Sequence, residues 1–274
     1  MRLLTFRTED GTRAGRLDGT GVTPLDAPDV GALLAAGADW RDRAAAAAGR
    51  PVPLGDLDLA PVVPNPSKII CVGLNYKEHI AETGHDTPEH PTLFAKFARS
   101  LIGASDEIVL PAASTAMDWE AELAIVIGRT VRAAGRDAAR AAIAGYTVAN
   151  DVSARDFQRR TTQWLQGKTF DSTTPLGPAL VTGDEVGDAA DLEITCAVDG
   201  ETMQRGRTSD MLFPPDEIVS YVSGIVTLDP GDVLLTGTPP GIGDSRTPPV
   251  RLRAGNVVMT EVEGLGVLGN RCAG

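Results

Sequence analysis

Two carboxylates stand at the start of an apolar run, in the order Glu120-Ala121-Glu122. The run that follows is rich in β-branched residues and ends at Gly128, which predicts a buried β-strand. Side chains at positions i and i+2 of a strand face the same side, so Glu120 and Glu122 are expected to project together, with Asp118 beside them if the strand begins early. Adjacent carboxylates repel each other unless a cation lies between them. The alternative is the solvated end of a strand.

A third carboxylate follows another apolar segment. Asp151 comes directly after the strand expected at 145–149, and its alternative role is to cap the next segment. Three oxygen ligands from Glu120, Glu122 and Asp151 would suit Mg²⁺ or Mn²⁺, which prefer oxygen and keep positions open for water and substrate. The three histidines lie at 79, 85 and 90, a spacing that fits no common zinc motif.

His79 and Glu82 are three positions apart in a polar segment. If the segment is helical, the two side chains share a face. A carboxylate beside an imidazole raises its basicity and fixes its tautomer, as a general base requires. The alternative is a surface histidine on a polar turn.

Two further features could bind an anion. Lys168 has few charged neighbours in sequence, and it could bind a substrate carboxylate or simply pair with Asp171. The segment 236–243, which includes Thr238, offers backbone N–H groups and hydroxyls after a short strand. Its alternative is a tight β turn.

Composition limits the class of partner. The chain of 274 residues has 25 basic and 37 acidic side chains and a net charge of −12, so no basic excess is available for a nucleic-acid backbone. No apolar run approaches the roughly 20 residues of a membrane span, and the first residues lack the apolar core of a signal peptide. Three widely spaced cysteines indicate a reducing compartment. We therefore expect a cytoplasmic protein with no nucleic-acid or membrane partner.

The order of elements predicts a β-rich α+β protein. Ala-rich helices are expected at 30–36 and 40–48, and prolines crowd 51–66, which favours an extended connector. We place a domain boundary there, with a small N-terminal α/β domain at 1–60 and the main domain at 61–274. Helices are also predicted at 136–144 and 214–223. Many short strands with frequent glycine and proline favour a barrel or sandwich-like core, with strands expected at 107–110, 121–127, 145–149, 179–182, 192–198, 233–236 and 256–262.

Taken in order, these segments resemble the fumarylacetoacetate hydrolase family, in its acylpyruvase and fumarylpyruvate hydrolase-like branch. The resemblance covers about residues 62–270, and no single block is specific alone. The blocks are Gly73-Leu74-Asn75-Tyr76-x-x-His79-x-x-Glu82, Phe94-x-Lys96, Glu120-x-Glu122-Leu123, Asn150-Asp151-Val152-Ser153-Ala154-Arg155-Asp156-x-Gln158, Gly167-Lys168-x-Phe170-Asp171, Pro175-Leu176-Gly177-Pro178, Thr208-Ser209-Asp210-Met211 and Pro230-Gly231-Asp232-Val233-x-x-Thr236-Gly237-Thr238-Pro239.

The resemblance implies a fold, a metal site and a homodimer. The fold would be a mixed β-sandwich roll with a small N-terminal domain. The metal would be Mg²⁺, with Mn²⁺ or Ca²⁺ as alternatives, and its ligands would be Glu120, Glu122 and Asp151, without Asp118. The resemblance also implies the His79–Glu82 pair on a lid, a substrate-holding lysine and threonine at Lys168 and Thr238, and Gln158 facing the substrate.

The resemblance also implies an activity. A small anionic 2-oxo acid would bind the metal, with His79, Glu82 and Lys168 as catalytic residues. Water activated by His79 would split the C–C bond of an acylpyruvate-type 2,4-dioxo acid through a metal-stabilised enolate, as in aromatic-compound catabolism. The alternatives are oxaloacetate-type decarboxylation, tautomerisation of hydroxymuconate-type diacids, and a non-catalytic metal- or ligand-binding protein. The chain departs from the family pattern at Arg99 and Arg207, where an extra cation could bind a second carboxylate or be a surface change.

Overall fold

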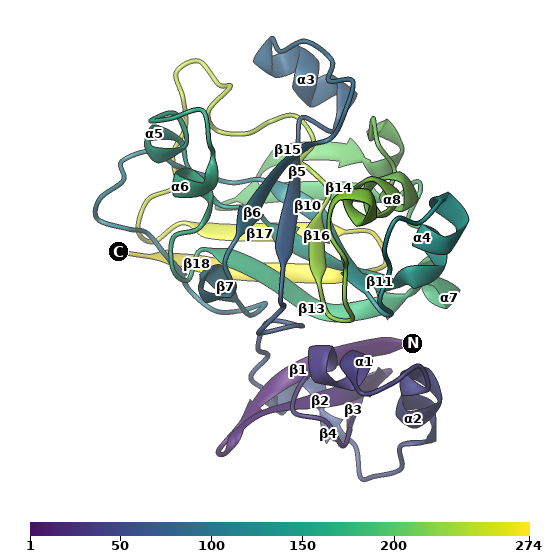
Figure 1. The fold of residues 1–274 in the computed structure, drawn as a ribbon. Helices are drawn as coiled ribbons and strands as arrows, with labels where there is room; N and C mark the ends of the chain where they lie inside the picture. Colours follow the sequence, from purple (N-terminus) through teal and green to yellow (C-terminus); the bar gives the residue numbers. More distant parts are fainter.

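A computed structural model describes all residues 1–274. Two β-sheets stack face to face, and Figure 1 shows strands of the smaller sheet crossing those of the larger sheet at a steep angle. The larger sheet has eleven strands: β1 (Arg2–Thr8), β2 (Gly11–Asp18), β3 (Gly21–Pro24), β4 (Val52–Pro53), β5 (Ile69–Gly73), β6 (Thr92–Lys96), β7 (Leu101–Ile102), β10 (Ala121–Ile127), β11 (Ile143–Asn150), β13 (Thr174–Thr182) and β16 (Val233–Leu235).

The smaller sheet has five strands in the order β15-β14-β17-β18-β8, and a separate pair joins β9 to β12. Their bounds are β8 (Ile108–Val109), β9 (Met117–Asp118), β12 (Ser153–Ala154), β14 (Glu193–Val198), β15 (Glu201–Arg207), β17 (Val257–Val262) and β18 (Gly266–Ala273). Parallel and antiparallel pairs occur together, since β16–β5, β13–β7 and β18–β8 are parallel. The predicted β-rich α+β class is confirmed.

The helices are short (Figure 1). They are α1 (Val30–Ala35), α2 (Trp40–Ala46), α3 (Lys77–Thr83), α4 (Arg136–Ala142), α5 (Arg155–Gln158), α6 (Leu165–Lys168), α7 (Gly183–Val186) and α8 (Pro215–Ile225). The predicted helices near 30, 40, 136 and 214 correspond to α1, α2, α4 and α8. None of the helices is long and apolar enough to span a membrane.

The position of strand β10 between two cores explains why its sequence is apolar without interruption. Every residue of the strand is buried, because each of its faces packs into a different core. Leu123 and Ile125 belong to the core between the two sheets, whereas Ala124 and Val126 belong to the core that continues toward α1 and α2. A strand buried on both faces needs apolar residues at every position, so the period of two is lost.

The first 60 residues form the β1–β4 strands and the two helices below the main body in Figure 1. Strand β1 also pairs with β13, with Leu3 opposite Leu180, so the hydrogen-bonded sheet continues into this segment. The domain boundary near residue 60 stays a prediction.

Candidate active site

A cavity of about 490 Å³ opens beside the carboxyl-terminal end of β5. This volume lies within the roughly 300–1,000 Å³ of small-molecule sites. Its walls come from β5 and α3, the start of β10, the α5–α6 segment and the loop after β16, and the predicted residues among them are His79, Glu82, Glu120, Glu122, Gln158, Lys168 and Thr238.

The register of two central strands brings the three acids together. Ala121 pairs with Asn150 across β10 and β11, so Glu120 lies beside Asp151, whose N–H donates to the Glu120 carbonyl at 2.8 Å. Carboxylate oxygens of Glu120, Glu122 and Asp151 lie within 4.8 Å of one another. All three residues are buried, with 6%, 1% and 0% exposure. The alternative of a solvated strand end is therefore wrong.

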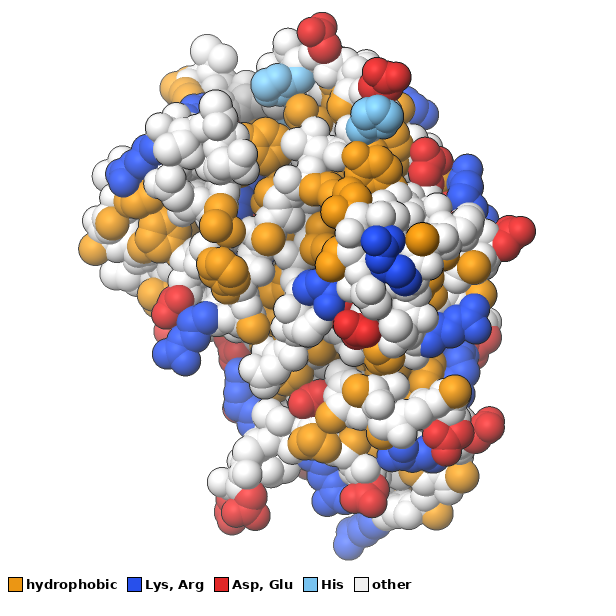
Figure 2. All heavy atoms as spheres, in the orientation of Figure 1, with side chains coloured by type: hydrophobic (Ala, Val, Ile, Leu, Met, Phe, Trp, Pro, Cys, Tyr) orange, Lys and Arg blue, Asp and Glu red, His pale blue; other side chains and the backbone are white.

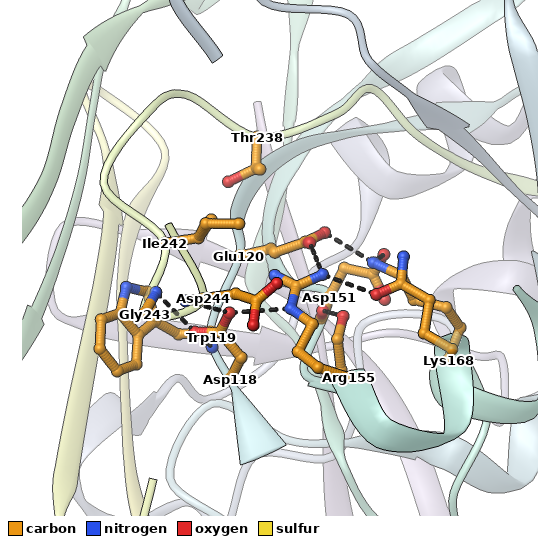
Figure 3. Close-up of polar contacts among 12 residues, drawn as sticks. Asp118, Trp119, Glu120, Asp151, Arg155, Lys168, Thr238, Ile242, Gly243 and Asp244 are labelled. Carbon is orange, nitrogen blue, oxygen red and sulfur yellow. Dashed lines mark hydrogen bonds and ion pairs between the residues drawn. The ribbon is translucent and has the colours of Figure 1, made fainter. Parts of the chain in front are cut away.

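Two buried lysines neutralise part of this charge. Lys168 Nζ donates to Glu120 Oε2 at 2.7 Å and to Asp151 Oδ2 at 2.8 Å, and Lys96 Nζ donates to Asp151 Oδ1 at 2.6 Å (Figure 3 shows the Lys168 contacts). The charges of Asp151 and Glu120 outweigh the effect of burial and raise the pKa of Lys168. The alternative pairing with Asp171 is wrong, because Asp171 is exposed and pairs with Arg99.

Glu122 is the carboxylate that no cation contacts. One oxygen accepts the Gly237 N–H at 2.6 Å. Burial, followed by the charges of Asp151 and Glu120, raises the pKa of Glu122 well above its usual value. A divalent cation bound among the three acids would relieve this repulsion, and oxygen donors alone suit Mg²⁺, Mn²⁺ or Ca²⁺. The donor set therefore fits the predicted metal.

Arg155 is a central residue of the site, and the sequence analysis did not predict it as a site residue. Its Nη1 lies 2.7 Å from Glu120 Oε1 and its Nε donates to Asp118 Oδ2 at 2.8 Å (Figure 3). Burial opposes ionisation of Glu120, but the charges of Lys168 and Arg155 lower the pKa of Glu120 to about 2. Arg155 Nη2 is buried without a partner in a side chain that lines the cavity. Arg155 stands in the Asn150–Gln158 block, and that position is the signal that could have identified it.

Asp118 is not one of the three clustered acids. It belongs to β9, and β10 begins only at Ala121, so the early strand start that would place Asp118 on one face with Glu120 does not occur. Its carboxylate accepts the N–H groups of Gly243 at 2.7 Å and Asp244 at 3.0 Å. Asp118 thus fixes the loop after β16 to the strand that precedes Glu120.

The approach of α6 to α5 places Lys168. A Cβ on Gly167 would lie 2.5 Å from the Gln158 backbone nitrogen and 2.6 Å from the Ala154 oxygen. Only glycine permits this separation, because backbone atoms cannot move aside as a flexible side chain can. The two short helices therefore hold Lys168 and Arg155 on one side of the acids.

His79 and Glu82 lie together on α3, as their spacing predicts. His79 Nδ1 is 3.2 Å from Glu82 Oε2, and both residues line the cavity together with Glu120 and Glu122. His79 is 7% exposed, so the alternative of a surface histidine is wrong. Burial opposes ionisation of Glu82, but hydrogen bonds to His79, Ser245 and the Gly241 N–H lower its pKa.

The loop after β16 binds carboxylates of the protein itself. The N–H groups of Gly237, Gly241 and Gly243 donate to Glu122, Glu82 and Asp118. Gly237 has a φ of +95°, and a Cβ there would lie 3.0 Å from the Val72 oxygen, so glycine is needed for the close approach. The predicted anion-binding loop is present, and its anions are side chains of this chain.

The remaining predicted residues divide into cavity and surface positions. Thr238 Oγ1 donates to the Ala121 oxygen at 2.9 Å and accepts from Gln204 at 2.8 Å, while Gln158 accepts from Arg155 Nη1 at 2.9 Å. Arg99 and Arg207 are exposed and pair with surface acids. Neither arginine lines the cavity, so of the two alternatives for Arg99 and Arg207, a surface change agrees with the structure.

Known proteins share this chain's sequence and fold. Residues 68–273 match the family model for the fumarylacetoacetate (FAA) hydrolase C-terminal domain. A mitochondrial oxaloacetate tautomerase of Homo sapiens is 49% identical over 232 residues, which are 84% of this chain and 74% of that protein. A 2,4-didehydro-3-deoxy-L-rhamnonate hydrolase of Sphingomonas is 47% identical over 201 residues, which are 73% of this chain and 70% of that protein.

Solved structures agree. A fumarylacetoacetate hydrolase from Exiguobacterium antarcticum is 33% identical with a TM-score of 0.88, over 100% of this chain and 99% of that chain. A 5-carboxymethyl-2-hydroxymuconate delta-isomerase from Mycobacterium smegmatis is 37% identical with a TM-score of 0.81, over 100% and 98% of the two chains. With a family model that spans most of the sequence and relatives near half identity, this chain belongs to the fumarylacetoacetate hydrolase family and is an enzyme of that family.

Proposed function

We propose that this enzyme interconverts the keto and enol forms of a small 2-oxo acid, with oxaloacetate as the first candidate substrate. The observation that carries the proposal is the His79–Glu82 pair in the wall of the cavity that Glu120 and Glu122 also line. Oxaloacetate tautomerases of nearly half identity support this choice of substrate. The reaction moves one proton between C3 and the 2-oxo oxygen and needs no other reactant.

The metal that we propose is Mg²⁺, held by Glu120, Glu122 and Asp151. A bound divalent cation would supply Lewis-acid polarisation of the 2-oxo group, which makes the C3 proton more acidic. Calcium and manganese accept the same oxygen ligands and stay as alternatives.

The protein's own residues would bind the acid and move the proton. The free N–H of Arg155, the Gln158 amide and Lys168 line the cavity and would hold the substrate's carboxylate end. The Thr238 hydroxyl would join them by turning from the Ala121 oxygen. His79 would take the C3 proton, because it lines the cavity and its Nδ1 is paired with Glu82, which fixes the orientation of the ring.

C–C bond hydrolysis of a 2,4-dioxo acid is the second candidate. The cavity of about 490 Å³ has room for a substrate larger than oxaloacetate, and the Sphingomonas relative is a hydrolase by name. Here the His79–Glu82 pair would deprotonate a water that adds to the C4 carbonyl. The C3–C4 bond then breaks, and the electron pair stays on C3 until a proton is returned.

One set of incubations separates these candidates. The protein is mixed with oxaloacetate or an acylpyruvate, with Mg²⁺ or with a chelator, while enol absorbance, pyruvate and released CO₂ are followed. Faster keto–enol exchange without pyruvate supports the tautomerase. Pyruvate from the acylpyruvate supports the hydrolase, and pyruvate with CO₂ from oxaloacetate supports the decarboxylase. Metal binding with no change in either substrate would show that the enzyme acts on another acid.

We also propose a homodimer formed through the outer face of the smaller sheet. Val257 and Met259 on β17 and Val267 on β18 are exposed there. Glu261 and Arg271 stand at opposite ends of this apolar group, because Val257 pairs with Arg271 and Glu261 with Val267. A twofold axis through the middle row would bring each Arg271 of one copy toward Glu261 of the other.

Light scattering after size-exclusion chromatography tests this interface. The unaltered protein is expected at twice the chain mass and Met259→Glu at the mass of one chain. Ile225→Glu, at an exposed apolar residue on α8, is the control and should stay dimeric. A dimer that persists in Met259→Glu would disprove the chosen face.

Figure 2 shows basic and acidic side chains interspersed on the face it displays, without one continuous basic area. The expected cytoplasmic location stays a prediction.

A further inference from the structure

The lid helix α3 meets the loop after β16 at a single carboxylate. Glu82 uses one oxygen for His79 and presents the other, Oε1, to that loop. Ser245 Oγ donates to Glu82 Oε1 at 2.7 Å, and the Gly241 N–H donates to the same oxygen at 3.0 Å. Both donors come from one loop turn, so they form a small cradle for a carboxylate that arrives from another element.

The loop side of this contact is firmly held. Asp118, a fully buried carboxylate, accepts the N–H groups of Gly243 and Asp244, and Trp119 Nε1 donates to the Gly241 oxygen at 3.2 Å. Figure 3 shows Asp118, Trp119 and Gly243 gathered at this anchor. The cradle is thereby fixed relative to Glu120, which follows Trp119 in the chain.

The lid side has fewer attachments. Beyond Glu82 and the buried side chains of His79 and Ile80, α3 is linked to the body by the Glu78 N–H, which donates to Asp210 at 3.2 Å, and by a bridge between Tyr76 and Met211. The helix ends at Gly84 in the left-handed conformation with a φ of +68°. A seven-residue helix with few tertiary contacts depends strongly on each of them.

Ser245 can also release the lid at little cost. Its hydroxyl lies 3.0 Å from the Ile242 carbonyl as well as 2.7 Å from Glu82. A hydroxyl has one proton and rotates to suit its acceptor. When Glu82 moves away, the hydroxyl proton has a second acceptor nearby, so opening leaves the Ser245 hydroxyl satisfied.

We propose that Ser245, with the Gly241 N–H, is a latch that holds Glu82 and so positions His79 over the cavity. Ser245 is a positioning residue, because it touches Glu82 rather than the reacting atoms. The consequence for the enzyme builds on the proposed function, whereas the latch itself is a property of the protein without substrate.

Hydrogen–deuterium exchange of the full-length protein without substrate tests the latch directly. Loss of a hydrogen bond to a charged group in Ser245→Ala should speed exchange in residues 77–84 roughly tenfold. Ser245→Thr keeps the hydroxyl and should restore slow exchange. Ser114→Ala removes a serine–carboxylate hydrogen bond of 2.6 Å to Asp156, away from the lid, and should leave these amides unchanged. Equal exchange in Ser245→Ala and the unaltered protein would overturn the proposal.

A pH profile gives the second readout once a substrate is found. The other charged or titratable groups that line this cavity are unchanged in the variant: His85, Glu120, Glu122, Arg155, Arg159, Lys168 and Asp244. Without the Ser245 donor, Glu82 needs a higher pH to ionise, so the acid limb of kcat/KM should move to higher pH in Ser245→Ala and return in Ser245→Thr. A lower rate with an unmoved acid limb would count against the latch. A protein that turns over no 2-oxo acid, yet shows the exchange result, would refute the proposed function and leave the latch intact.

Discussion

Lys168 contacts a carboxylate of the proposed metal site, because its Nζ lies 2.7 Å from Glu120 Oε2. It lies equally close to Asp151, at 2.8 Å. The lysine is therefore a neighbour of the ligands as well as a residue of the cavity wall. A substitution of Lys168 can therefore change metal binding and substrate binding, and the two effects can be measured separately.

Replacement of Lys168 by Met should keep metal binding and reduce turnover. Removal of a positive charge next to two carboxylates favours a cation there, so metal affinity should stay the same or rise. Loss of the ammonium should lower kcat/KM by roughly 100-fold, chiefly through KM, if it binds the substrate carboxylate. Titration calorimetry with Mg²⁺ and steady-state kinetics measure the two effects. A loss of metal binding would instead show that Lys168 mainly holds the ligands in place.

Glu122→Gln is the sharper test of the metal site. Removal of Glu120 would take one ion-pair partner from each of two buried cations, Lys168 and Arg155, so its effect on metal binding could not be separated from its effect on folding. Glu122 contacts no cation, and glutamine still accepts the Gly237 N–H. We expect metal affinity to fall by at least roughly 100-fold, with activity falling alongside it. The exposed acid Asp171, changed to Asn, is the control; unchanged metal content in Glu122→Gln would argue against the triad.

His79→Ala should abolish proton transfer while the metal stays bound. A positioned general base contributes about 10²–10⁴-fold to rate, so kcat should fall by that range. His90→Ala is the matched control, because His90 stacks on Tyr221 and does not line the cavity. Metal content by elemental analysis and turnover of the substrate identified above measure the two properties. Full activity in His79→Ala would eliminate the pair as the base.

Gly167→Ala should separate α5 from α6. The added Cβ meets backbone atoms of Gln158 and Ala154, so we expect a loss of about 1–3 kcal/mol in unfolding free energy and a displaced Lys168. Gly224→Ala on α8 meets nothing within 4 Å and should be neutral or stabilising by up to about 1 kcal/mol. Urea unfolding of both variants measures the difference. Equal stability of the two would show that the segment relaxes freely.

The contacts of Asp216 with two arginines should make a pH-dependent contribution to stability. It is 6% exposed and accepts hydrogen bonds from Arg136 and Arg140. Burial opposes its ionisation, but these arginines outweigh burial and lower its pKa. A lowered folded-state pKa stabilises the protein above the unfolded value near 3.9, and this stability is lost as pH falls through the folded pKa. The difference in urea midpoint between the unaltered protein and Asp216→Asn should be largest at neutral pH and shrink below about pH 4.

The sequence by itself determined local structure and family. The apolar run at 121–127 requires a strand buried on both faces, and the spacing of His79 and Glu82 places them together on any helix. The ordered blocks identified the family that the comparisons confirm. Two strands of the smaller sheet, β15 and β18, were not predicted, because glycines and charged residues weaken their pattern and pairing with neighbours stabilises them.

Only the tertiary structure decided which groups meet. The register of Ala121 with Asn150 brings Asp151 to the two glutamates, and no local pattern specifies a register between strands so far apart in sequence. The same holds for Arg155 against Glu120, for Lys168 against the acids rather than Asp171, and for Ser245 against Glu82. A strand pattern says which way a side chain faces, but buried charges choose partners only after folding excludes water.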